Sequence, residues 1–233
     1  MLSIIIPTLN EEDYLPLVLE SIQKQTFKDC EVIIADAGSK DATLEIARKY
    51  GCKIVAGGLP AKGRNNGAKV AKGDVLLFLD ADVILPPSFL KNAMGEFKQR
   101  GLGIAGFKVL PLHGRKIDVL TFYLYNTWVA LNQRILPYAA TAIMSDKKNH
   151  HDIGGFDEEI KLFEDISYTR KMAKVAKYGY IDEPFFTSVR RYQKDGRLMN
   201  VTYFLAGLYV NFLGPIKSDI FNYKFGHYKD EKK

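Results

Sequence analysis

The stretch that decides the fold is Gly73-Asp74-Val75-Leu76-Leu77-Phe78-Leu79-Asp80-Ala81-Asp82. Residues 75–79 form an uninterrupted apolar run, which is typical of a strand covered on both faces. Two carboxylates follow at the carboxyl end of this strand, the edge at which open α/β sheets bind their ligands. Magnesium is usually held by one or two carboxylates together with substrate phosphates, so Asp80 and Asp82 predict a site for a divalent cation and a diphosphate. The structural alternative is that one aspartate caps the helix after Pro86-Pro87 and the other is solvated.

Around this strand the chain alternates between strand and helix patterns. Strands are predicted at 2–6, 31–36, 53–55 and 75–79, and helices at 13–25, 41–50 and 61–71. This alternation predicts an α/β protein with a Rossmann-like, mostly parallel central sheet and helices on both of its faces. Beyond residue 82 we expect helices over 87–100 and 166–177, a longer amphipathic segment over 117–135, and strands over 104–110, 139–144 and 180–186. We therefore expect one domain over residues 1–190 and a C-terminal amphipathic helical appendage over residues 191–233.

The composition restricts the classes of protein that the chain can belong to. A length of 233 residues with 47% hydrophobic residues suits one large domain with a substantial core. Cys30 and Cys52 have no metal-type spacing, and the chain enters its first strand without a basic leader region. These features favour a cytoplasmic location, with peripheral attachment to the inner face of the cell membrane left open. The net charge of +6 suits anionic partners, and without a nucleic-acid-binding signature we expect no nucleic acid among them.

One glycine pattern suggests a dinucleotide site and is rejected. Residues 101–106 read Gly-Leu-Gly-Ile-Ala-Gly, which matches the G-x-G-x-x-G fingerprint. That fingerprint needs a strand before it and a helix after it, whereas here a helical pattern precedes and a strand follows. The glycines are therefore predicted to form a turn, and a dehydrogenase is not expected.

Polar motifs end three of the predicted strands, and a fourth motif follows later. Residues 4–12 read Ile-Ile-Ile-Pro-Thr-Leu-Asn-Glu-Glu, and residues 36–43 read Asp-Ala-Gly-Ser-Lys-Asp-Ala-Thr. The third motif is the stretch at 73–82, and the fourth is Gly154-Gly155-Phe156-Asp157-Glu158 followed by Phe163-Glu164-Asp165. In this order and spacing the segments resemble glycosyltransferase family 2, the inverting nucleotide-sugar transferases of the GT-A fold. Each motif alone is weak, but the four together are specific, and the resemblance covers roughly residues 2–190.

The resemblance implies a donor site at the strand ends. The nucleotide base would lie against residues 7–9 with Asp36 nearby, and Glu11 and Asp80 would be close to the ribose. Asp82 would bind Mg²⁺ or Mn²⁺ between the two phosphates, where the cation stabilises the charge of the leaving diphosphate. The donor-binding residues are therefore expected to be Pro7, Thr8, Leu9, Glu11, Asp36, Lys62, Arg64, Asp80, Ala81 and Arg191. The alternatives are a helix cap for Asp36 and solvated surface charges for Lys62, Arg64 and Arg191.

An inverting displacement also needs a base for the acceptor hydroxyl. Asp165 matches the second acidic residue of the family's Glu-Asp pair, so the resemblance implies that it is the catalytic base. The alternative is a favourable charge at the N-terminus of the next helix, a role that suits Glu164 better. His113, His150 and His151 lie in no recognisable ligand position, and we predict that none is catalytic.

The arginine pair at 190–191 follows a predicted strand, so its members should point to opposite faces of an extended chain. Arg191, or else Arg190, would then steady the diphosphate. Residues 198–213 are strongly apolar, but they are too few and too often interrupted by polar residues for a normal membrane span. With basic residues just upstream, they are typical of an interfacial membrane helix. A helix docked on the domain, or on a second subunit in a homodimer, is the alternative.

We therefore expect a metal-dependent inverting glycosyltransferase. Its donor would be a nucleoside-diphosphate sugar, UDP-linked before GDP-linked by family frequency. Its acceptor would be a hydroxyl or phosphate group of a glycan, with a lipid-linked acceptor as one option. A sugar-nucleotide pyrophosphorylase is disfavoured because the loop after the first strand contains no glycine. A non-catalytic nucleotide-sugar- or membrane-binding relic of the same fold is the alternative function.

Overall fold

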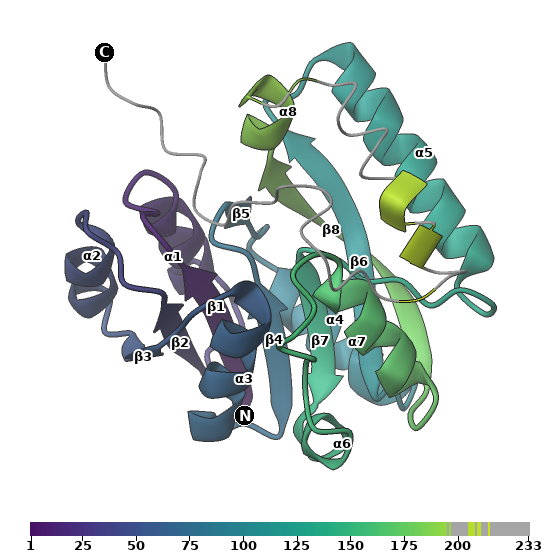
Figure 1. The fold of residues 1–233 in the computed structure, drawn as a ribbon, viewed down its shortest axis with the longest axis horizontal. Helices are drawn as coiled ribbons and strands as arrows, with labels where there is room; N and C mark the ends of the chain where they lie inside the picture. Colours follow the sequence, from purple (N-terminus) through teal and green to yellow (C-terminus); the bar gives the residue numbers. More distant parts are fainter. Residues whose placement is uncertain (195, 197–204, 208, 211–213, 215–233) are drawn as a thin grey trace.

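The structure is a computed structural model that describes residues 1–194, 196, 205–207, 209–210 and 214. The described residues form an eight-stranded sheet in the order β3-β2-β1-β4-β7-β6-β8-β5 (Figure 1). Most of segment 198–213, and with it the predicted interfacial helix, lies outside the described residues. Within the described ranges, no helix combines the length and the apolarity needed to cross a bilayer.

The first half of the sheet is parallel. Its strands are β1 (Leu2–Thr8), β2 (Cys30–Asp36), β3 (Lys53–Ala56) and β4 (Val75–Leu79). Every residue of β1 and β4 is buried, which agrees with their continuous apolar sequences. The helices of this half are α1 (Leu15–Gln23), α2 (Thr43–Lys49) and α3 (Pro60–Val70). The predicted alternation is confirmed here, and it brings the ends of β1, β2 and β4 to one edge of the sheet.

The second half of the sheet is mixed. It contains β5 (Val83–Ile84), β6 (Ile104–Leu112), β7 (Ala142–Asp146) and β8 (Tyr178–Ser188). Strand β7 runs antiparallel to β4 and β6, β8 runs parallel to β6, and β5 pairs antiparallel with β8. The helices are α4 (Phe89–Gln99), α5 (Lys116–Asn132), α6 (Lys147–Asp152), α7 (Glu164–Ala173) and the short α8 (Arg190–Lys194). Because α4 ends just before residues 101–106 and β6 begins within them, the G-x-G-x-x-G pattern forms a turn, as predicted.

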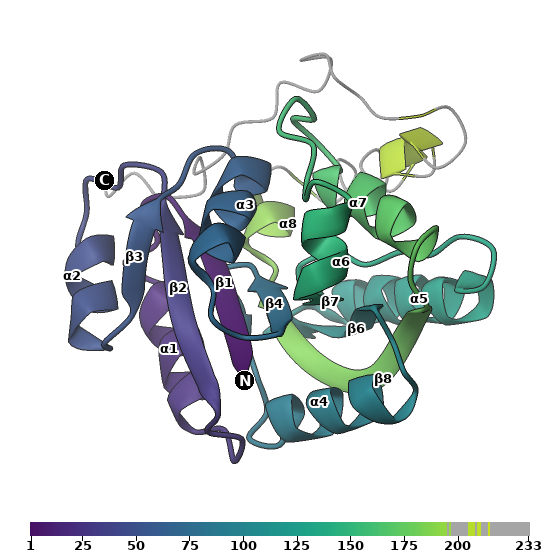
Figure 2. The same cartoon turned by 90° about the horizontal axis from the view of Figure 1, so that it is seen from below.

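Alternate side chains of the sheet enter two cores. Ile4 and Ile6 pack with residues of α1 and α4, whereas Ile5 packs with residues of α3 and α7. Figure 2 shows these two layers of helices on opposite faces of the sheet. The predicted α/β architecture is therefore confirmed. The sequence analysis did not predict β5, α6 and α8, which are each two to six residues long.

The close contact between α3 and β1 makes a packing prediction. A Cβ atom added to Gly67 of α3 would lie 2.4 Å from Cγ2 of the fully buried Ile5. Since the β-branched Ile5 side chain cannot easily rotate away, Gly67→Ala should lower the free energy of unfolding by about 1–3 kcal/mol. Gly95→Ala is the matched control, because a Cβ at Gly95 of α4 meets nothing within 4 Å. It should stabilise the protein by up to about 1 kcal/mol through helix propensity. Urea unfolding measures both variants, and equal stabilities would contradict the packing.

Candidate active site

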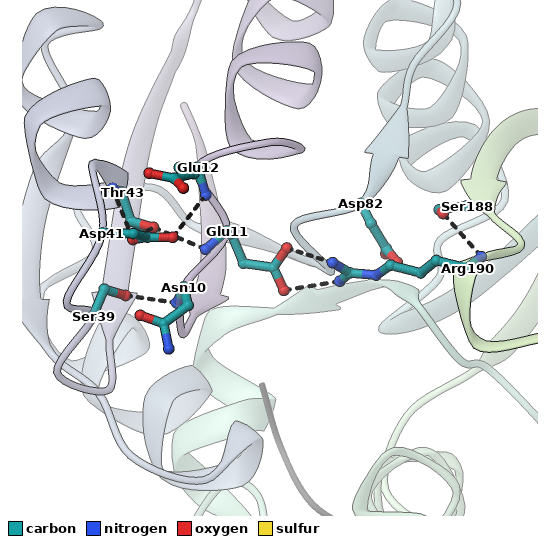
Figure 3. Close-up of polar contacts among 9 residues, drawn as sticks. All are labelled: Asn10, Glu11, Glu12, Ser39, Asp41, Thr43, Asp82, Ser188 and Arg190. Atoms are coloured by element: carbon teal, nitrogen blue, oxygen red, sulfur yellow. Dashed lines mark hydrogen bonds and ion pairs between the residues drawn. The ribbon is translucent and has the colours of Figure 1, made fainter. Parts of the chain in front are cut away.

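The loops after β1 and β2 are joined by hydrogen bonds (Figure 3). The Asn10 N–H donates to Oγ of Ser39 at 2.9 Å, and the Glu11 N–H donates to Oγ1 of Thr43 at 2.8 Å. In the opposite direction, Oδ1 of Asn10 accepts the N–H of Lys40 at 2.9 Å. The short polar side chains of the two sequence motifs therefore position the backbone of Glu11, whose side chain points away from this junction.

Asp36 organises the second of these loops. One of its carboxylate oxygens accepts the N–H groups of Gly38 and Ser39, and the other accepts the hydroxyls of Thr8 and Ser39. The side chain is nearly buried, and each oxygen has two donors. The structure therefore gives Asp36 a loop-organising role, and its contact with a nucleotide base stays a prediction.

Glu11 points to the other half of the sheet, where it meets Arg190. The two side chains form a bidentate ion pair with both N–O distances at 2.8 Å (Figure 3). The Nε of the same guanidinium lies 2.9 Å from Oδ2 of Asp82, and its plane lies over the ring of Tyr14 at 4.5 Å. Burial raises the pKa of Glu11, and the pairing with Arg190 acts against that rise. A single guanidinium thus links the ends of β1 and β4 to α8.

The expectation that Arg190 and Arg191 lie on opposite faces of an extended chain is wrong. Strand β8 ends at Ser188, whose N–H donates to the carbonyl of Asp82 at 3.0 Å, and the chain is helical from Arg190. Both charges therefore lie near the site. Burial raises the pKa of Asp80, and the charge of Arg191 is one of those that oppose this rise. The contact of Arg191 with a diphosphate stays a prediction.

A second arginine, which is buried, links Asp80 to the fourth motif. Arg64 of α3 donates to Oδ1 of Asp80 at 3.0 Å and to Oε1 of Glu164 on α7, and its side chain is only 6% exposed. Its guanidinium also lies 5.3 Å from the ring centroid of Phe156. Within the described residues, Nε of Arg64 is buried without a hydrogen bond. Arg64 is therefore a structural cross-link between two motifs that are distant in the sequence.

Asp165 lies beside this ion-pair cluster on the first turn of α7. Phe163, the N-cap residue of α7, has a left-handed backbone with φ at 64°, which turns the chain into the helix. Burial raises the pKa of Asp165 to about 7, the charge of Glu164 adds to the rise, and Arg64 opposes it. Glu164 is ion-paired with Arg64, whereas Asp165 accepts the N–H of Ile166 at 2.8 Å. Two adjacent carboxylates are thus placed in different environments, an arrangement that separates acid–base roles in enzymes.

The Gly-Gly-Phe-Asp-Glu motif is held by Asn65, a residue that the sequence analysis missed. The Asn65 amide exchanges two hydrogen bonds of 2.9 Å with the backbone of Phe156 and donates a third to Glu158. Gly155 has φ at 70°, and a Cβ there would lie 2.5 Å from Oδ1 of Asn65. One signal in the sequence could have indicated Asn65. It is an asparagine next to Arg64 on the buried side of α3, a helix otherwise rich in glycine and alanine.

The remaining predicted residues have varied surroundings. Pro7, Thr8 and Ala81 are buried, Leu9 is partly exposed, and Lys62 is exposed on the first turn of α3. Their contacts with a donor stay predictions. Among the histidines, His150 is a core residue: its Nδ1 lies 2.9 Å from the hydroxyl of Tyr168, and burial lowers its pKa to about 4.

The aspartates after β4 fit a hard cation by their chemistry. Both offer carboxylate oxygens at the sheet edge, and Asp82 is close enough to Asp80 and Glu11 to raise the pKa of each. In the described part of the chain, no group of three or more His, Cys, Asp or Glu side chains is arranged to hold a metal ion. Magnesium commonly uses one or two carboxylates and completes its shell with substrate phosphates and water. The residues therefore fit a cation that arrives with a diphosphate, in competition with Arg190 for Asp82.

The sheet order and the carboxylates at its edge define an α/β protein of the GT-A type. The model of the Glycosyl transferase family 2 matches residues 3–155, which is more than half of the chain. The chain belongs to glycosyl transferase family 2, and the family resemblance seen in the sequence is confirmed.

Named relatives agree with this assignment. The poly(ribitol-phosphate) beta-N-acetylglucosaminyltransferase TarS of Staphylococcus aureus strain Mu50 is 31% identical over 186 residues, which is 72% of this chain and 32% of the relative. A crystal structure of S. aureus TarS 1-349 in complex with UDP-GlcNAc superposes with a TM-score of 0.68 at 26% identity, over 80% of this chain and 58% of that one.

The fold is shared more widely. The mannosyltransferase PcManGT of Pyrobaculum calidifontis, in complex with GDP-Man and Mn²⁺, has a TM-score of 0.68 at 19% identity, over 89% of this chain and 64% of that one. The chain spans about a third of the length of TarS.

The Arg64 cross-link yields a stability prediction. Arg64→Met should lower the free energy of unfolding by about 3 kcal/mol, because it leaves the buried Glu164 carboxylate without its partner. The cost lies at the low end for a buried pair because the Asp80 side chain is 39% exposed. Adding Glu164→Gln should recover part of the loss. Lys148→Met, which breaks an exposed pair with Asp152, should cost less than about 1 kcal/mol. Chemical denaturation measures all three, and equal losses for Arg64→Met and Lys148→Met would exclude the cross-link.

Proposed function

We propose that the protein is an inverting glycosyltransferase that moves a sugar from a nucleoside-diphosphate sugar to a hydroxyl or phosphate acceptor. The observation that carries the proposal is the assembly of Asp80, Asp82 and Asp165 near the buried Arg64 and the partly exposed Arg190 in a family 2 chain. The UDP-GlcNAc complex of TarS supports a UDP-sugar as the first choice of donor. The GDP-Man and Mn²⁺ complex of PcManGT supports a GDP-sugar as the second choice and a divalent cation as cofactor.

The proposed reaction is a single displacement. The acceptor oxygen attacks the anomeric carbon, the bond from that carbon to the diphosphate oxygen breaks, and the configuration inverts. Asp165 accepts the proton of the acceptor hydroxyl on its carboxylate. Its raised pKa makes it a stronger base than an ordinary aspartate while leaving it ionised above about pH 7. A cation bound by Asp82 and the donor phosphates would supply Lewis-acid stabilisation of the departing diphosphate.

The arginines support both halves of this site. Arg64 fixes Asp80 against Glu164 and thereby holds the first turn of α7, where Asp165 lies, beside the end of β4. Arg190 holds Glu11 and Asp82 together. If a cation were held by Asp82, the bidentate bond to Glu11 would keep Arg190 at this edge, where its Nε would be available to donate to a phosphate oxygen of the donor.

The proposed acceptor follows the substrate of the relative TarS. TarS is named for a poly(ribitol-phosphate) substrate, which supports a hydroxyl on a polyol-phosphate or glycan chain as the acceptor. Residues 1–190 would form the transferase domain. A non-catalytic relic would bind the nucleotide sugar without cleaving it, so slow metal-dependent hydrolysis of the donor in the absence of acceptor separates that alternative from an enzyme.

The role of Asp165 predicts a loss of turnover without a loss of donor binding. Asp165→Asn should lower the turnover number about 10²–10⁴-fold, because the acceptor proton has no base. The wild-type rate should rise with pH through about 7 as Asp165 ionises, and the variant should lack this limb. Steady-state transfer assays across pH measure both effects, and UDP binding by calorimetry checks the site. Glu45→Gln, on the exposed side of α2, is the control. Near-normal turnover of Asp165→Asn at saturating substrates would remove Asp165 from this role.

The pairing of Arg190 with Asp82 predicts competition with the cation. Arg190→Gln should strengthen the binding of Mn²⁺ to the donor-free protein by about tenfold, because charge-assisted hydrogen bonds that hold the carboxylates are removed. Asp82→Asn should abolish this binding in both backgrounds. Electron paramagnetic resonance of free Mn²⁺ measures the affinity without turnover, and Arg100→Gln, whose partner Glu96 is on the surface of α4, is the control. Unchanged Mn²⁺ affinity in Arg190→Gln would show that Arg190 does not compete for Asp82.

A further inference from the structure

Helix α5 has an apolar outer face. Six of the thirteen large hydrophobic residues that are exposed in the described part of the chain lie on this helix, and Ile135 follows just beyond its end. The six are Ile117, Val119, Leu120, Tyr123, Leu124 and Leu131, with exposed fractions between 51% and 79%. The inner face of α5 is buried and mixed, since Phe122 and Val129 lie there together with the polar Asp118 and Asn126. A contiguous exposed apolar face marks a site of contact with a protein or a membrane, and α5 borders the molecule (Figure 1).

The two exposed threonines of this face do not depend on water for their hydrogen bonds. The exposed Thr121 donates its hydroxyl to the carbonyl of Ile117 at 2.9 Å, and the exposed Thr127 donates to the carbonyl of Tyr123 at 2.8 Å. Both donors are satisfied by the helix backbone, as occurs for threonine in membrane helices. An apolar medium could therefore cover the face without leaving these donors unpaired.

The exposed charges of residues 115–135 are all positive. Arg115 and Lys116 are exposed at the start of α5, and Arg134 is exposed just after its end. Within residues 115–135 the single carboxylate, Asp118, is 2% exposed and accepts the N–H of Arg115 at 2.8 Å. Cations at a helix N-terminus oppose the helix dipole, at a cost of about 0.3–1 kcal/mol each. Their presence is better explained by an anionic partner than by the stability of the helix.

A second copy of the chain fits this face poorly. An antiparallel pair of α5 helices would place Arg134 of one copy beside Arg115 and Lys116 of the other. A parallel pair would place Arg115 and Lys116 of one copy beside the same residues of the other, and Arg134 beside Arg134. In both arrangements like charges meet without an acidic residue of this face between them, which is unfavourable. An anionic bilayer satisfies both the apolar stripe and the cations.

We propose that the outer face of α5 docks on an anionic lipid bilayer. The apolar side chains of residues 117–135 would enter the boundary between headgroups and acyl chains, with Arg115, Lys116 and Arg134 on the lipid phosphates. This surface differs from residues 198–213, for which the sequence suggested an interfacial helix.

The inner side of α5 packs against Tyr138, since the ring of Tyr125 lies edge-on to it at 5.7 Å between ring centroids. Burial raises the pKa of both tyrosines, and the charge of Asp165 adds to the rise. If the proposed function holds, docking through α5 would place the acceptor side of the site close to the bilayer. That arrangement suits an acceptor that is itself attached to the membrane.

The full chain should bind vesicles of phosphatidylcholine and phosphatidylglycerol, and it should not bind vesicles of phosphatidylcholine alone. Binding, measured by co-sedimentation, should fall as salt rises, because anionic-lipid attraction is screened. Lys116→Gln should weaken vesicle binding about fivefold, because each basic residue near an anionic lipid surface contributes about 1 kcal/mol of binding free energy. The double variant Leu120→Asp and Leu124→Asp should abolish it. Val175→Asp is the matched control, since Val175 is equally exposed but lies beyond α7.

Two outcomes would overturn the proposal. The first is equal vesicle binding by the double variant and the wild type. The second is a wild-type protein that does not bind vesicles, is dimeric in sedimentation analysis, and becomes monomeric in the double variant. That result would make the outer face of α5 a contact between two copies of the chain. Hydrolysis of the donor in solution should be unchanged in the double variant. Failure of docking is therefore distinguishable from failure of the proposed transferase activity, which the Asp165 variant tests separately.

Discussion

Repulsion among the carboxylates of the site is offset by two arginines, the buried Arg64 and the partly exposed Arg190. Five carboxylates gather at one edge of the sheet: Glu11, Asp80, Asp82, Glu164 and Asp165. Two like unit charges 4 Å apart repel by about 4 kcal/mol near a protein surface. Arg64 and Arg190 each lie between two of these carboxylates, within 3.0 Å of both partners. Without these guanidinium groups, the strand ends would have to separate or take up protons.

The same arginines join the two halves of the molecule. Arg64 belongs to the parallel half and reaches α7, whereas Arg190 follows β8 and reaches back to the loop after β1. Their planar, forked donors allow one residue to hold two partners, as the bidentate bond to Glu11 shows. A lysine in either position would supply charge without this fixed geometry. The relative positions of Asp82 and Asp165 therefore follow from electrostatic cross-links as well as from the sheet.

The sequence predicted the features that arise from local pattern. The apolar runs of β1 and β4, the alternation with helices, and the polar strand ends at Glu11 and Asp82 follow from periodicity and the family motifs. The pairing of side chains could not be predicted in this way. Arg190 was placed on an extended chain because nothing in Arg190-Arg191-Tyr192 shows that a helix begins there. The roles of Asn65 and Glu164 depend on the contact of α3 with loops about a hundred positions later, which no local pattern encodes. The outer face of α5 was missed for a related reason, since its amphipathic pattern does not show which apolar residues remain uncovered.

The charge balance also explains why the proposed donor would need a cation. Arg64 is paired with Asp80 and Glu164 and lies near the charge of Asp165, and Glu11 and Asp82 bind Arg190. The cluster therefore holds five carboxylates and two guanidinium groups. A diphosphate adds further negative charge at the same edge, and Arg191 and Lys62 are the additional basic residues predicted to meet it. A divalent cation on Asp82 would reverse the local sign at the phosphates. It would also free the Nε of Arg190 from Asp82. Binding of the cation and binding of the donor would then be coupled through the Asp82 carboxylate.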